Sequence, residues 1–342
     1  MRILVTGGAG FIGSNFCHYV YRRRPDWSIT VLDKLTYAGR RENLAGLEES
    51  GRLRFIHGDI CVPGDVAEAM EGCSRVVNFA AETHVDRSIE DSAGFVRTDV
   101  EGVRVLLEEF RRREGRLFLQ ISTDEVYGSV ETGRSSEADP LRPRSPYSAS
   151  KAGGELLAMG YWHTHRTPVV VTRASNNYGP RQYPEKLIPL FLTNAMEGDS
   201  LPLYGDGANR RDWIYVEDHC AALLRVLEKA GPGSVYNIGA GEEHSNLEVT
   251  RAILDAVGAG EELIRFVEDR PGHDRRYALD VSRIESELGW APSVDFEEGL
   301  RRTVRWYRDN EDWWKAIKSG RFREYYKRQY SRRLEESEGG PR

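Results

Sequence analysis

Short apolar runs alternate with helix-length segments through the first half of the chain, and this alternation limits the possible folds more than any other feature. Segments 95–113 and 146–165 are each long enough to cover one face of a sheet. Repeats of strand, helix and strand predict a parallel sheet with crossover helices. We therefore expect an α/β protein built on a doubly wound parallel sheet. The expected strands span residues 2–6, 28–32, 54–57, 75–79, 117–121 and 168–172.

A smaller C-terminal lobe is expected after about residue 175, where prolines and a Gly-Asp-Gly loop divide the chain into shorter pieces. Residues 235–238 form another apolar run that could return to the first sheet. The predicted sheet domain therefore takes residues 1–175 and also 213–239. The substrate-binding lobe would take residues 176–212 and 240–330, and the polar residues 331–342 are expected to be a disordered tail.

Composition excludes several classes of protein. The chain has 342 residues, enough to bury a core without crosslinks. Its four cysteines, at positions 17, 61, 73 and 220, form no C-x-x-C pair and have no histidine at zinc-ligand spacing. A formal net charge of -6 argues against nucleic-acid binding. Without a basic leader or a bilayer-length apolar stretch, we expect a cytoplasmic protein with no metal, nucleic-acid or membrane partner.

A glycine-rich segment directly follows the first expected strand and opens a helix. Gly7, Gly10 and Gly13 are spaced three residues apart in V-T-G-G-A-G-F-I-G. Glycine allows a sharp turn and lets a pyrophosphate approach the helix N-terminus, whose free N–H groups favour an anion. The pattern predicts a Rossmann dinucleotide site, although glycine turns also join strands to helices for structural reasons alone.

Asp33 supports the dinucleotide interpretation because it ends the second expected strand, twenty residues after Gly13. A carboxylate there accepts hydrogen bonds from the adenosine ribose and repels a 2′-phosphate, which favours NAD over NADP. A plain loop carboxylate is the alternative, and the neighbouring Lys34 weakens the exclusion of NADP. Asp59 and Ile60 follow the third strand, where they could contact adenine, although Asp59 could instead cap a helix.

Tyr147 and Lys151 lie four residues apart in a predicted helix that opens with Ser145 as cap and Pro146 as first residue. Their side chains should share one helix face. An ammonium near the phenol, together with a positive nicotinamide, would lower the pKa of Tyr147 and let it take a hydroxyl proton while hydride leaves the same carbon. A lone Y-x-x-x-K is common by chance, but here it follows the cofactor motif at a suitable distance.

With these motifs the sequence resembles the extended short-chain dehydrogenase/reductase family over roughly residues 1–330. The run I-S-T-D-E-V-Y-G at 121–128 is similar to the nucleotide-sugar 4,6-dehydratases of that family. The resemblance implies tightly bound NAD and a catalytic set of Thr123, Asp124, Glu125, Tyr147 and Lys151. It also implies cofactor contacts from Gly7, Gly10, Phe11, Ile12, Gly13, Asp33, Lys34, Leu35, Thr36, Asp59, Ile60, Phe79, Ala80, Ala81, Thr98, Tyr147, Lys151 and Asn177.

The chemistry of a 4,6-dehydratase explains the acidic pair. Transient oxidation at the sugar's 4-position makes the 5-proton acidic, so Glu125 could remove it while a protonated Asp124 donates to the departing 6-hydroxyl. Hydride would then return to position 6. Adjacent carboxyls in a closed cleft tend to have separated pKa values, which suits one acid and one base. The alternative is a charged loop after a strand.

Several stretches of the second lobe resemble the dTDP-glucose branch of the dehydratases. The run 268–277 favours a dTDP-linked sugar, namely dTDP-glucose, on resemblance alone. Arg211 would pair with a phosphate, and the 4-keto-6-deoxy product would enter deoxysugar biosynthesis, whether of rhamnose or another sugar. The implied substrate contacts are Thr83, Thr123, Asn176, Lys186, Leu187, Pro202, Tyr204, Arg211, Asn246, Asp269, Arg270 and His273.

Alternatives remain at this stage. A UDP-sugar 4,6-dehydratase would share the whole catalytic set, and a nucleotide-sugar 4-epimerase would share the cofactor site and the Tyr147 and Lys151 pair without needing the acids. A dinucleotide-sensing regulator would keep the fold and lose the chemistry. The resemblance further implies a homodimer built from two long helices of each subunit.

Overall fold

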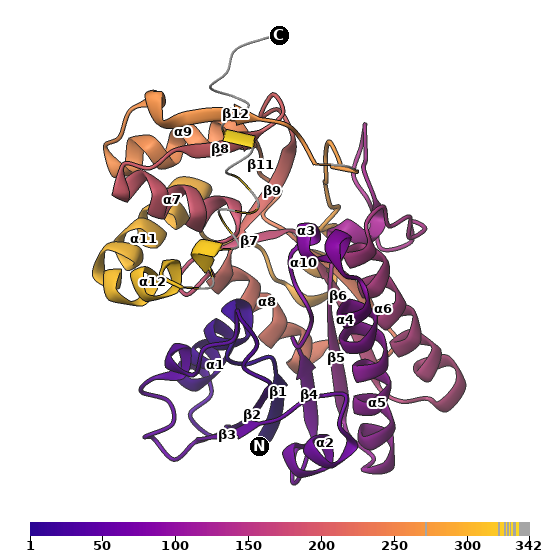
Figure 1. The fold of residues 1–342 in the computed structure, drawn as a ribbon. Coiled ribbons are helices and arrows are strands. Elements are labelled where there is room, and N and C mark those ends of the chain that lie inside the picture. Colours follow the sequence, from indigo (N-terminus) through magenta and orange to yellow (C-terminus); the bar gives the residue numbers. More distant parts are fainter. Residues whose placement is uncertain are drawn as a thin grey trace.

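The computed structural model describes residues 1–270, 272–320, 322–324, 326, 328, 330 and 333–334. Its largest element within these residues is a seven-stranded parallel sheet in the order β10-β6-β5-β4-β1-β2-β3 (Figure 1). The expected doubly wound α/β fold is thereby confirmed. The strands are β1 (Arg2–Thr6), β2 (Ser28–Asp33), β3 (Leu53–His57), β4 (Arg75–Asn78), β5 (Leu117–Thr123), β6 (Val169–Ala174) and β10 (Val235–Ile238).

Apolar residues point to both faces of this sheet, and each face has its own core. One core includes Ile3, Val5 and Val31 with helices α1, α8 and α10, and the other includes Leu4, Leu32 and Val76 with α2, α5 and α6. Burial on both faces explains why the strands read as continuous apolar runs. These helices are α1 (Phe11–Arg23), α2 (Pro63–Ala69), α5 (Val103–Arg112), α6 (Pro146–His165), α8 (Val216–Lys229) and α10 (Ser282–Leu288).

The long helix expected over 95–113 differs from the prediction, because it is interrupted by a π-helical turn. The segment consists of α4 (Ala93–Val96), the π-helix η2 (Arg97–Gly102) and α5. The wide turn carries the buried Asp99, whose Oδ2 accepts a hydrogen bond from Ser150 Oγ of α6 at 2.6 Å. Single π turns often occur at functional sites, and this one lies beside Lys151.

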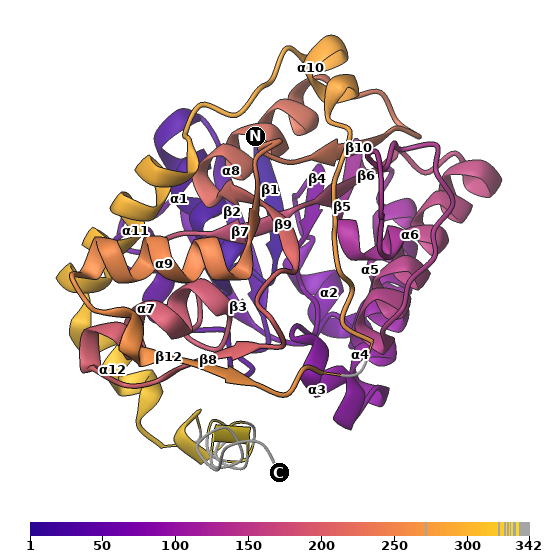
Figure 2. The same cartoon turned by 90° about the horizontal axis from the view of Figure 1, so that it is seen from above.

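The smaller lobe lies beyond the carboxyl ends of the large sheet, opposite the N-terminus of the chain (Figures 1 and 2). In it β7 pairs parallel and β11 pairs antiparallel with β9, and β12 pairs with β8. The return to the large sheet begins at α8, because residues 213–215 still belong to β9. The lobe's elements are β7 (Asn176–Tyr178), α7 (Leu187–Glu197), β8 (Leu201–Tyr204), β9 (Arg210–Tyr215), β11 (Glu243–Ser245), α9 (Asn246–Val257), β12 (Ile264–Val267), α11 (Phe296–Asp309) and α12 (Glu311–Lys318).

Aromatic side chains near the end of the described chain pack the smaller lobe. Tyr307 and Trp314 are almost fully buried in its core, and Trp306, Trp313 and Tyr326 pack against that core. Short segments complete the fold: α3 (Val85–Glu90) and the 3-10 helices η1 (Arg41–Leu44), η3 (Asp124–Tyr127) and η4 (Glu261–Leu263). Of the predicted disordered tail 331–342, all but residues 333 and 334 lie outside the described residues.

Among the described residues, none of the helices combines the length and apolar character that a membrane crossing needs.

Candidate active site

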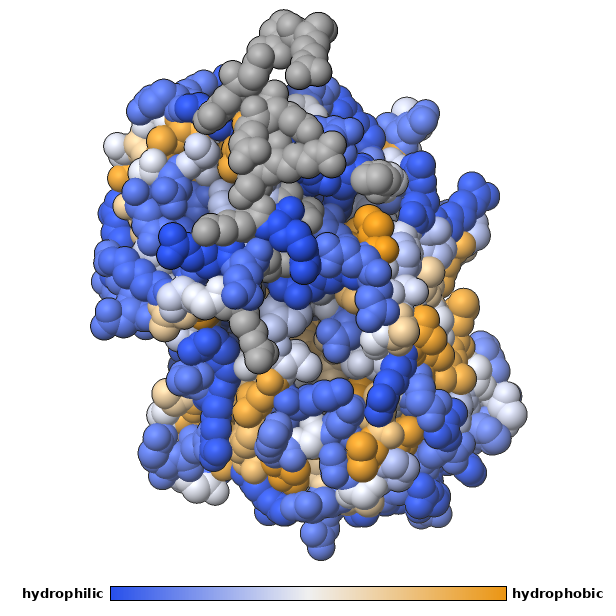
Figure 3. Space-filling model, in the orientation of Figure 1, coloured by the Kyte–Doolittle hydropathy of each residue, from blue (hydrophilic) through white to orange (hydrophobic). Residues whose placement is uncertain are grey.

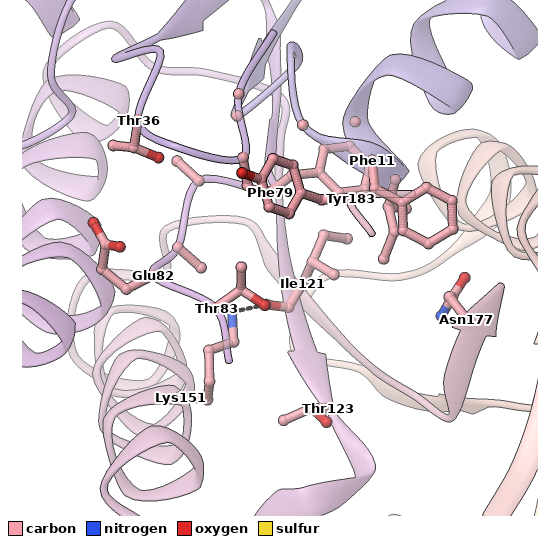
Figure 4. Close-up of a pocket in the computed structure, with 18 of the residues that line it drawn as sticks. Phe11, Thr36, Phe79, Glu82, Thr83, Ile121, Thr123, Lys151, Asn177 and Tyr183 are labelled. Carbon is pink, nitrogen blue, oxygen red and sulfur yellow. Dashed lines mark hydrogen bonds between the residues drawn. The ribbon is translucent and has the colours of Figure 1, made fainter. Parts of the chain in front are cut away.

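A cavity of about 360 Å³ lies between the carboxyl ends of the sheet and the smaller lobe (Figure 4). Its walls come from the glycine-rich loop, the ends of β2, β4 and β5, the start of α6 and the strand β7. The strand order reverses between β1 and β4, and open parallel sheets bind ligands in the crevice at such a point. The volume is in the usual range for small-molecule sites.

The glycine-rich loop leaves no room for side chains. Gly7 has a φ of +67°, and a Cβ there would lie 2.6 Å from Ala80 N. At Gly13 a Cβ would lie 2.3 Å from Gly7 O. Gly10 is the N-cap of α1 and provides no side-chain cap, so the first N–H groups of this helix stay available to a ligand. The loop therefore fits an anionic group such as a pyrophosphate.

Asp33 ends β2 at the cavity wall. Its Oδ2 accepts a hydrogen bond from Ala9 N and its Oδ1 one from Leu35 N, both at 2.8 Å. Burial raises the pKa of this carboxyl, and the two backbone hydrogen bonds oppose that effect. Each carboxylate oxygen can accept a further bond, so the residue fits the ribose contact predicted from the sequence.

Lys34 and Asp59 form an ion pair across the cavity rim, with 2.8 Å between Nζ and Oδ2. Asp59 Oδ1 also accepts a hydrogen bond from Cys61 N. The alternative that Asp59 caps a helix is wrong. The N-cap position of α2 is Val62, and no side chain forms a capping hydrogen bond with this helix. Because Lys34 is paired with Asp59, its charge is partly neutralised.

The cavity brings together all but one of the residues predicted to contact the cofactor. Leu35 is the exception, since it packs against the apolar core and is absent from the cavity wall. Its φ of +51° turns the chain there. Thr36, Phe79 and Asn177 lie at the cavity as expected (Figure 4).

Two buried oxygen-bearing residues end β5 and begin η3. The Thr123 hydroxyl donates to Asp124 Oδ1 at 3.0 Å and accepts from Glu125 N at 3.2 Å. Asp124 is 3% exposed, and its Oδ2 has no hydrogen-bond partner. Burial, followed by the nearby Glu125, raises the pKa of Asp124 to about 8. Asp124 is thus predominantly a neutral acid at pH 7.

Glu125 lies beside Asp124 in the same cavity wall. Burial raises its pKa, while Arg270, Lys186 and Arg211 favour the carboxylate. Burial is the largest influence on both carboxyls, but Arg211 is the one cation among the main influences on Asp124, whereas three cations favour the Glu125 carboxylate. This asymmetry suits an acid and a base.

Tyr147 and Lys151 occupy the first turns of α6, which Ser145 and Ser148 cap reciprocally. The prediction that Lys151 and a positive nicotinamide together lower the pKa of Tyr147 concerns the site with its cofactor bound, and it stays a prediction. Lys151 Nζ donates to Ile121 O at 2.8 Å (Figure 4). Burial, followed by the carboxylates of Glu125, Asp99 and Asp124, raises the pKa of Tyr147 well above its usual value. A tyrosinate here needs a further positive charge near the phenol.

Predicted substrate residues fall into two groups. Thr83, Thr123, Asn176, Lys186 and Leu187 line the cavity. The remaining ones lie outside its wall, on β8, β9, the start of α9 and the loop before Tyr277: Pro202, Tyr204, Arg211, Asn246, Asp269, Arg270 and His273.

Two arginines of the outer group, Arg211 and Arg270, are held by hydrogen bonds to neighbouring residues, and both influence the ionisation of Glu125 in the cavity wall. Arg211 donates to the backbone oxygens of Arg210 and Asp274, both at 2.7 Å, so a phosphate contact would use its remaining N–H groups. Arg270 donates to Asp86 at 3.2 Å. Arg211 and Arg270 both stabilise the ionised form of Glu125.

Sequence reasoning missed several residues of the cavity wall. The Tyr37 hydroxyl donates to Glu185 Oε1 at 2.6 Å and so links the loop after β2 to the smaller lobe. His219 Nδ1 lies 2.8 Å from Asn177 Oδ1, and burial lowers the pKa of His219 to about 3. The neutral ring must donate to that oxygen, which orients the amide. No spacing in the sequence signals either contact.

Within the part of the chain that the structure describes, no group of three or more His, Cys, Asp and Glu side chains could hold a metal ion.

Comparison with known proteins gives a consistent result. The family model described as GDP-mannose 4,6 dehydratase matches residues 4–303. A dTDP-glucose 4,6-dehydratase from Streptomyces niveus is 53% identical over 323 residues, covering 93% of this chain and 96% of that protein. The crystal structure of DesIV, a dTDP-glucose 4,6-dehydratase from Streptomyces venezuelae with NAD and TYD bound, is 50% identical with a TM-score of 0.91 and covers 93% of this chain and 100% of its own. A Thermus thermophilus UDP-glucose 4-epimerase in complex with NAD is 34% identical with a TM-score of 0.84, covering 91% and 100% of the two chains.

Proposed function

The chain belongs to the family described as GDP-mannose 4,6 dehydratase, and we propose that it converts dTDP-glucose to dTDP-4-keto-6-deoxyglucose with loss of water. The observation that carries this proposal is the pair of adjacent acids at the end of β5. Asp124 has a buried, unpartnered oxygen in the cavity wall, and Glu125 lies next to it. A 4-epimerase needs no such pair. The relatives at about half identity include dTDP-glucose 4,6-dehydratases from Streptomyces niveus and Streptomyces venezuelae.

NAD is the cofactor, and the residues present fit it. Gly7, Gly10 and Gly13 make the close approach that a pyrophosphate needs, and Asp33 offers a carboxylate to a ribose. His219 holds the amide of Asn177 in one orientation at the other end of the cavity. When bound, NAD supplies the acceptor for the hydride that leaves carbon 4 and the donor of the hydride that reaches carbon 6.

The side chains of this protein carry the proton transfers. Tyr147, as phenolate, takes the proton of the sugar's 4-hydroxyl. The resulting ketone makes the proton on carbon 5 acidic, and Glu125 Oε removes it as general base. Asp124, neutral at pH 7, donates its proton to the oxygen on carbon 6, which leaves as water. Glu125 finally returns its proton to carbon 5.

The nucleotide is held by the smaller lobe in this proposal, and the sheet domain holds NAD. Arg211 and Arg270 are cations at the cavity's edge, near enough to stabilise the Glu125 carboxylate. They suit a diphosphate that arrives with the sugar. A dTDP-linked substrate would then be discriminated by the surrounding residues of β8 and α9.

The decisive test mixes purified NAD-loaded protein with dTDP-glucose and measures product mass. A dehydratase product lacks one water, whereas unchanged mass with inverted configuration would identify an epimerase. No turnover on any nucleotide glucose would favour a regulator. Competition between dTDP-glucose and UDP-glucose then measures the nucleotide preference, and equal use of both would contradict the dTDP assignment.

A variant pair tests the base. Glu125→Gln should stop exchange of the 5-proton with solvent while some reduced NAD still accumulates, because oxidation precedes the step it removes. The exposed Glu131 provides the matched control, and Glu131→Gln should behave as the unmodified protein. Normal 5-proton exchange in Glu125→Gln would remove Glu125 from the base role.

We also propose a homodimer formed through the α6 side of the sheet domain. Leu156 on α6 is 61% exposed and Val96 on α4 is 54% exposed. Figure 3 shows apolar side chains gathered on the side where α4 and α6 lie in Figure 1. Exposed apolar patches of this kind mark interaction sites, and a twofold pairing of the same patch is the commonest arrangement.

A reducing compartment such as the cytoplasm is the proposed location. All four cysteines are free thiols, and three of them are buried. Proteins that mature in oxidising compartments commonly pair such residues.

A further inference from the structure

The loop that joins β2 to η1 lies beside the two features that fit NAD. Near its start, Leu35 N donates to Asp33 Oδ1 at 2.8 Å. At its end, Arg40 N donates to Ala9 O of the glycine-rich loop at 3.0 Å. Gly39 packs against the Asp33 carboxylate, since a Cβ at Gly39 would lie 2.8 Å from Asp33 Oδ1. The loop therefore contacts both the carboxylate that fits a ribose and the segment that fits a pyrophosphate.

Tyr37, in the middle of this loop, connects it to two other segments of the cavity wall. Its hydroxyl donates to Glu185 Oε1 at 2.6 Å and also to the backbone oxygen of Thr83 at 3.0 Å. Glu185 lies just before α7 in the smaller lobe, whereas Thr83 follows β4 of the sheet domain. The rings of Tyr37 and Tyr183 also meet edge to face, with 5.4 Å between their centroids. Thr83 and Tyr183 are both labelled at the cavity in Figure 4. One side chain thus joins the cofactor loop to both lobes.

Arg87 on α3 contacts both partners of this hydrogen bond. Its Nε and Nη2 donate to Glu185 Oε2 at 3.3 and 3.1 Å, and its guanidinium carbon lies 3.8 Å from the centroid of the Tyr37 ring. The Glu185 side chain is 1% exposed, and hydrogen bonds shielded from water in this way are strengthened. Burial, followed by the charge of Glu185, raises the pKa of Tyr37, so the hydroxyl keeps the proton that it donates. Each of the three residues therefore holds the other two.

We propose that Tyr37, Arg87 and Glu185 form a clasp that keeps NAD bound from one turnover to the next. The cavity lies between the sheet domain and the smaller lobe, so release of a dinucleotide from it requires movement of the loop or of that lobe. The clasp resists both movements, because its hydrogen bonds cross from the loop to the smaller lobe. Retention suits the dehydration proposed above, on which this inference rests, because the hydride returns to the sugar and NAD is restored within each turnover.

The test measures how fast labelled NAD leaves the holoenzyme after an excess of unlabelled NAD is added. Tyr37→Phe removes the hydroxyl and keeps the ring beside Arg87, so it isolates the hydrogen bond to Glu185. NAD should leave this variant at least about tenfold faster than the unmodified protein, because hydrogen bonds to ionised groups are the stronger ones. Tyr21→Phe is the matched control, since Arg52 lies 4.2 Å from the ring centroid of Tyr21, which is outside the cavity wall. Its release rate should stay within about twofold of the unmodified rate.

A second variant tests whether the clasp acts as one unit. Glu185→Gln leaves a neutral acceptor, which weakens the hydrogen bonds from both Tyr37 and Arg87, so NAD should again leave at least about tenfold faster. The double variant, Tyr37→Phe with Glu185→Gln, should release NAD within about twofold of the rate of Glu185→Gln alone, because the hydroxyl acts through that side chain. Two effects that multiply in the double variant would show independent action and would overturn the clasp.

A release rate in Tyr37→Phe as slow as in the control would also overturn the proposal. So would failure of the NAD-depleted variant to bind labelled NAD again, because the loss of NAD would then follow from unfolding. Should Glu185→Gln fail to fold, Tyr37→Phe and its control decide alone. None of these measurements needs turnover. Failure of the proposed dehydration is therefore recognised separately, because the unmodified protein would then release no water from dTDP-glucose.

Discussion

The pH dependence of the acid Asp124 gives the sharpest test of the site. Burial, and then Glu125, raises its pKa to about 8. With that value about nine-tenths of the carboxyl is protonated at pH 7 and about one-tenth at pH 9. Since only the protonated form can donate to the 6-hydroxyl, kcat should fall about tenfold between these pH values. The assay is steady-state release of the dehydrated product from dTDP-glucose across the range.

The variant Asp124→Asn tests whether the fall in kcat between pH 7 and pH 9 comes from Asp124. An amide cannot supply the proton, so product formation should drop by about 10² to 10⁴, while exchange of the 5-proton by Glu125 persists. The remaining activity should show no fall between pH 7 and pH 9. A flat profile in the unmodified protein, or the same fall in Asp124→Asn, would refute the reasoning.

Stability provides an independent measure of the same pKa. Because the folded pKa of Asp124 lies above its unfolded value of 3.8, the native state binds the additional proton between about pH 4 and pH 8. Stability is therefore lost as pH rises through this window, by up to roughly 1.4 kcal/mol per pH unit. Asp124→Asn has no carboxyl to ionise. In urea unfolding, its free energy of unfolding relative to that of the unmodified protein should therefore be higher at pH 8 than at pH 5. An equal difference at both pH values would contradict the raised pKa.

Three further predictions concern the cofactor loop, the interface and the core. Gly13→Ala should abolish retention of NAD, measured as nucleotide released on denaturation, because its Cβ would lie 2.3 Å from a backbone oxygen; Gly64→Ala, with open space around it, should retain NAD. Leu156→Asp should convert the proposed dimer to a monomer in sedimentation experiments. An unchanged molecular mass would show that the dimer interface does not include Leu156. Glu155→Gln should lower the free energy of unfolding by about 3 to 5 kcal/mol in urea, because Arg173 keeps a buried charge without its partner; a loss below 1 kcal/mol would show that the pair is dispensable.

Local sequence was sufficient for much of the fold. The six expected strands all occur, and residues 235–238 return to the sheet as β10. Each strand can be recognised in the sequence as an apolar run because helices cover both faces of the sheet. The interrupted helix over 93–112 could not be foreseen, because its π turn depends on packing against α6, where Asp99 meets Ser150.

The candidate site was foreseen where one short segment carries the chemistry. Gly7 to Gly13, Thr123 to Glu125 and the turn with Tyr147 each sit at the carboxyl end of a strand or the start of a helix, so their positions follow from the order of elements. Contacts between distant segments were not foreseen, including His219 with Asn177 and Tyr37 with Glu185. These pairs join residues 42 and 148 positions apart, and no local pattern encodes them.

The sequence by itself determined the parallel sheet, the glycine loop and the residue types available for proton transfer, because these depend on neighbours in the chain. Only the tertiary structure decided how those residues ionise and which partners they have. Burial raises the pKa values of both Asp124 and Tyr147, nearby carboxylates add to the shift of Tyr147, and Lys151 donates to Ile121 O. Desolvation and charge interactions act across space, so they depend on segments that meet only when the chain folds.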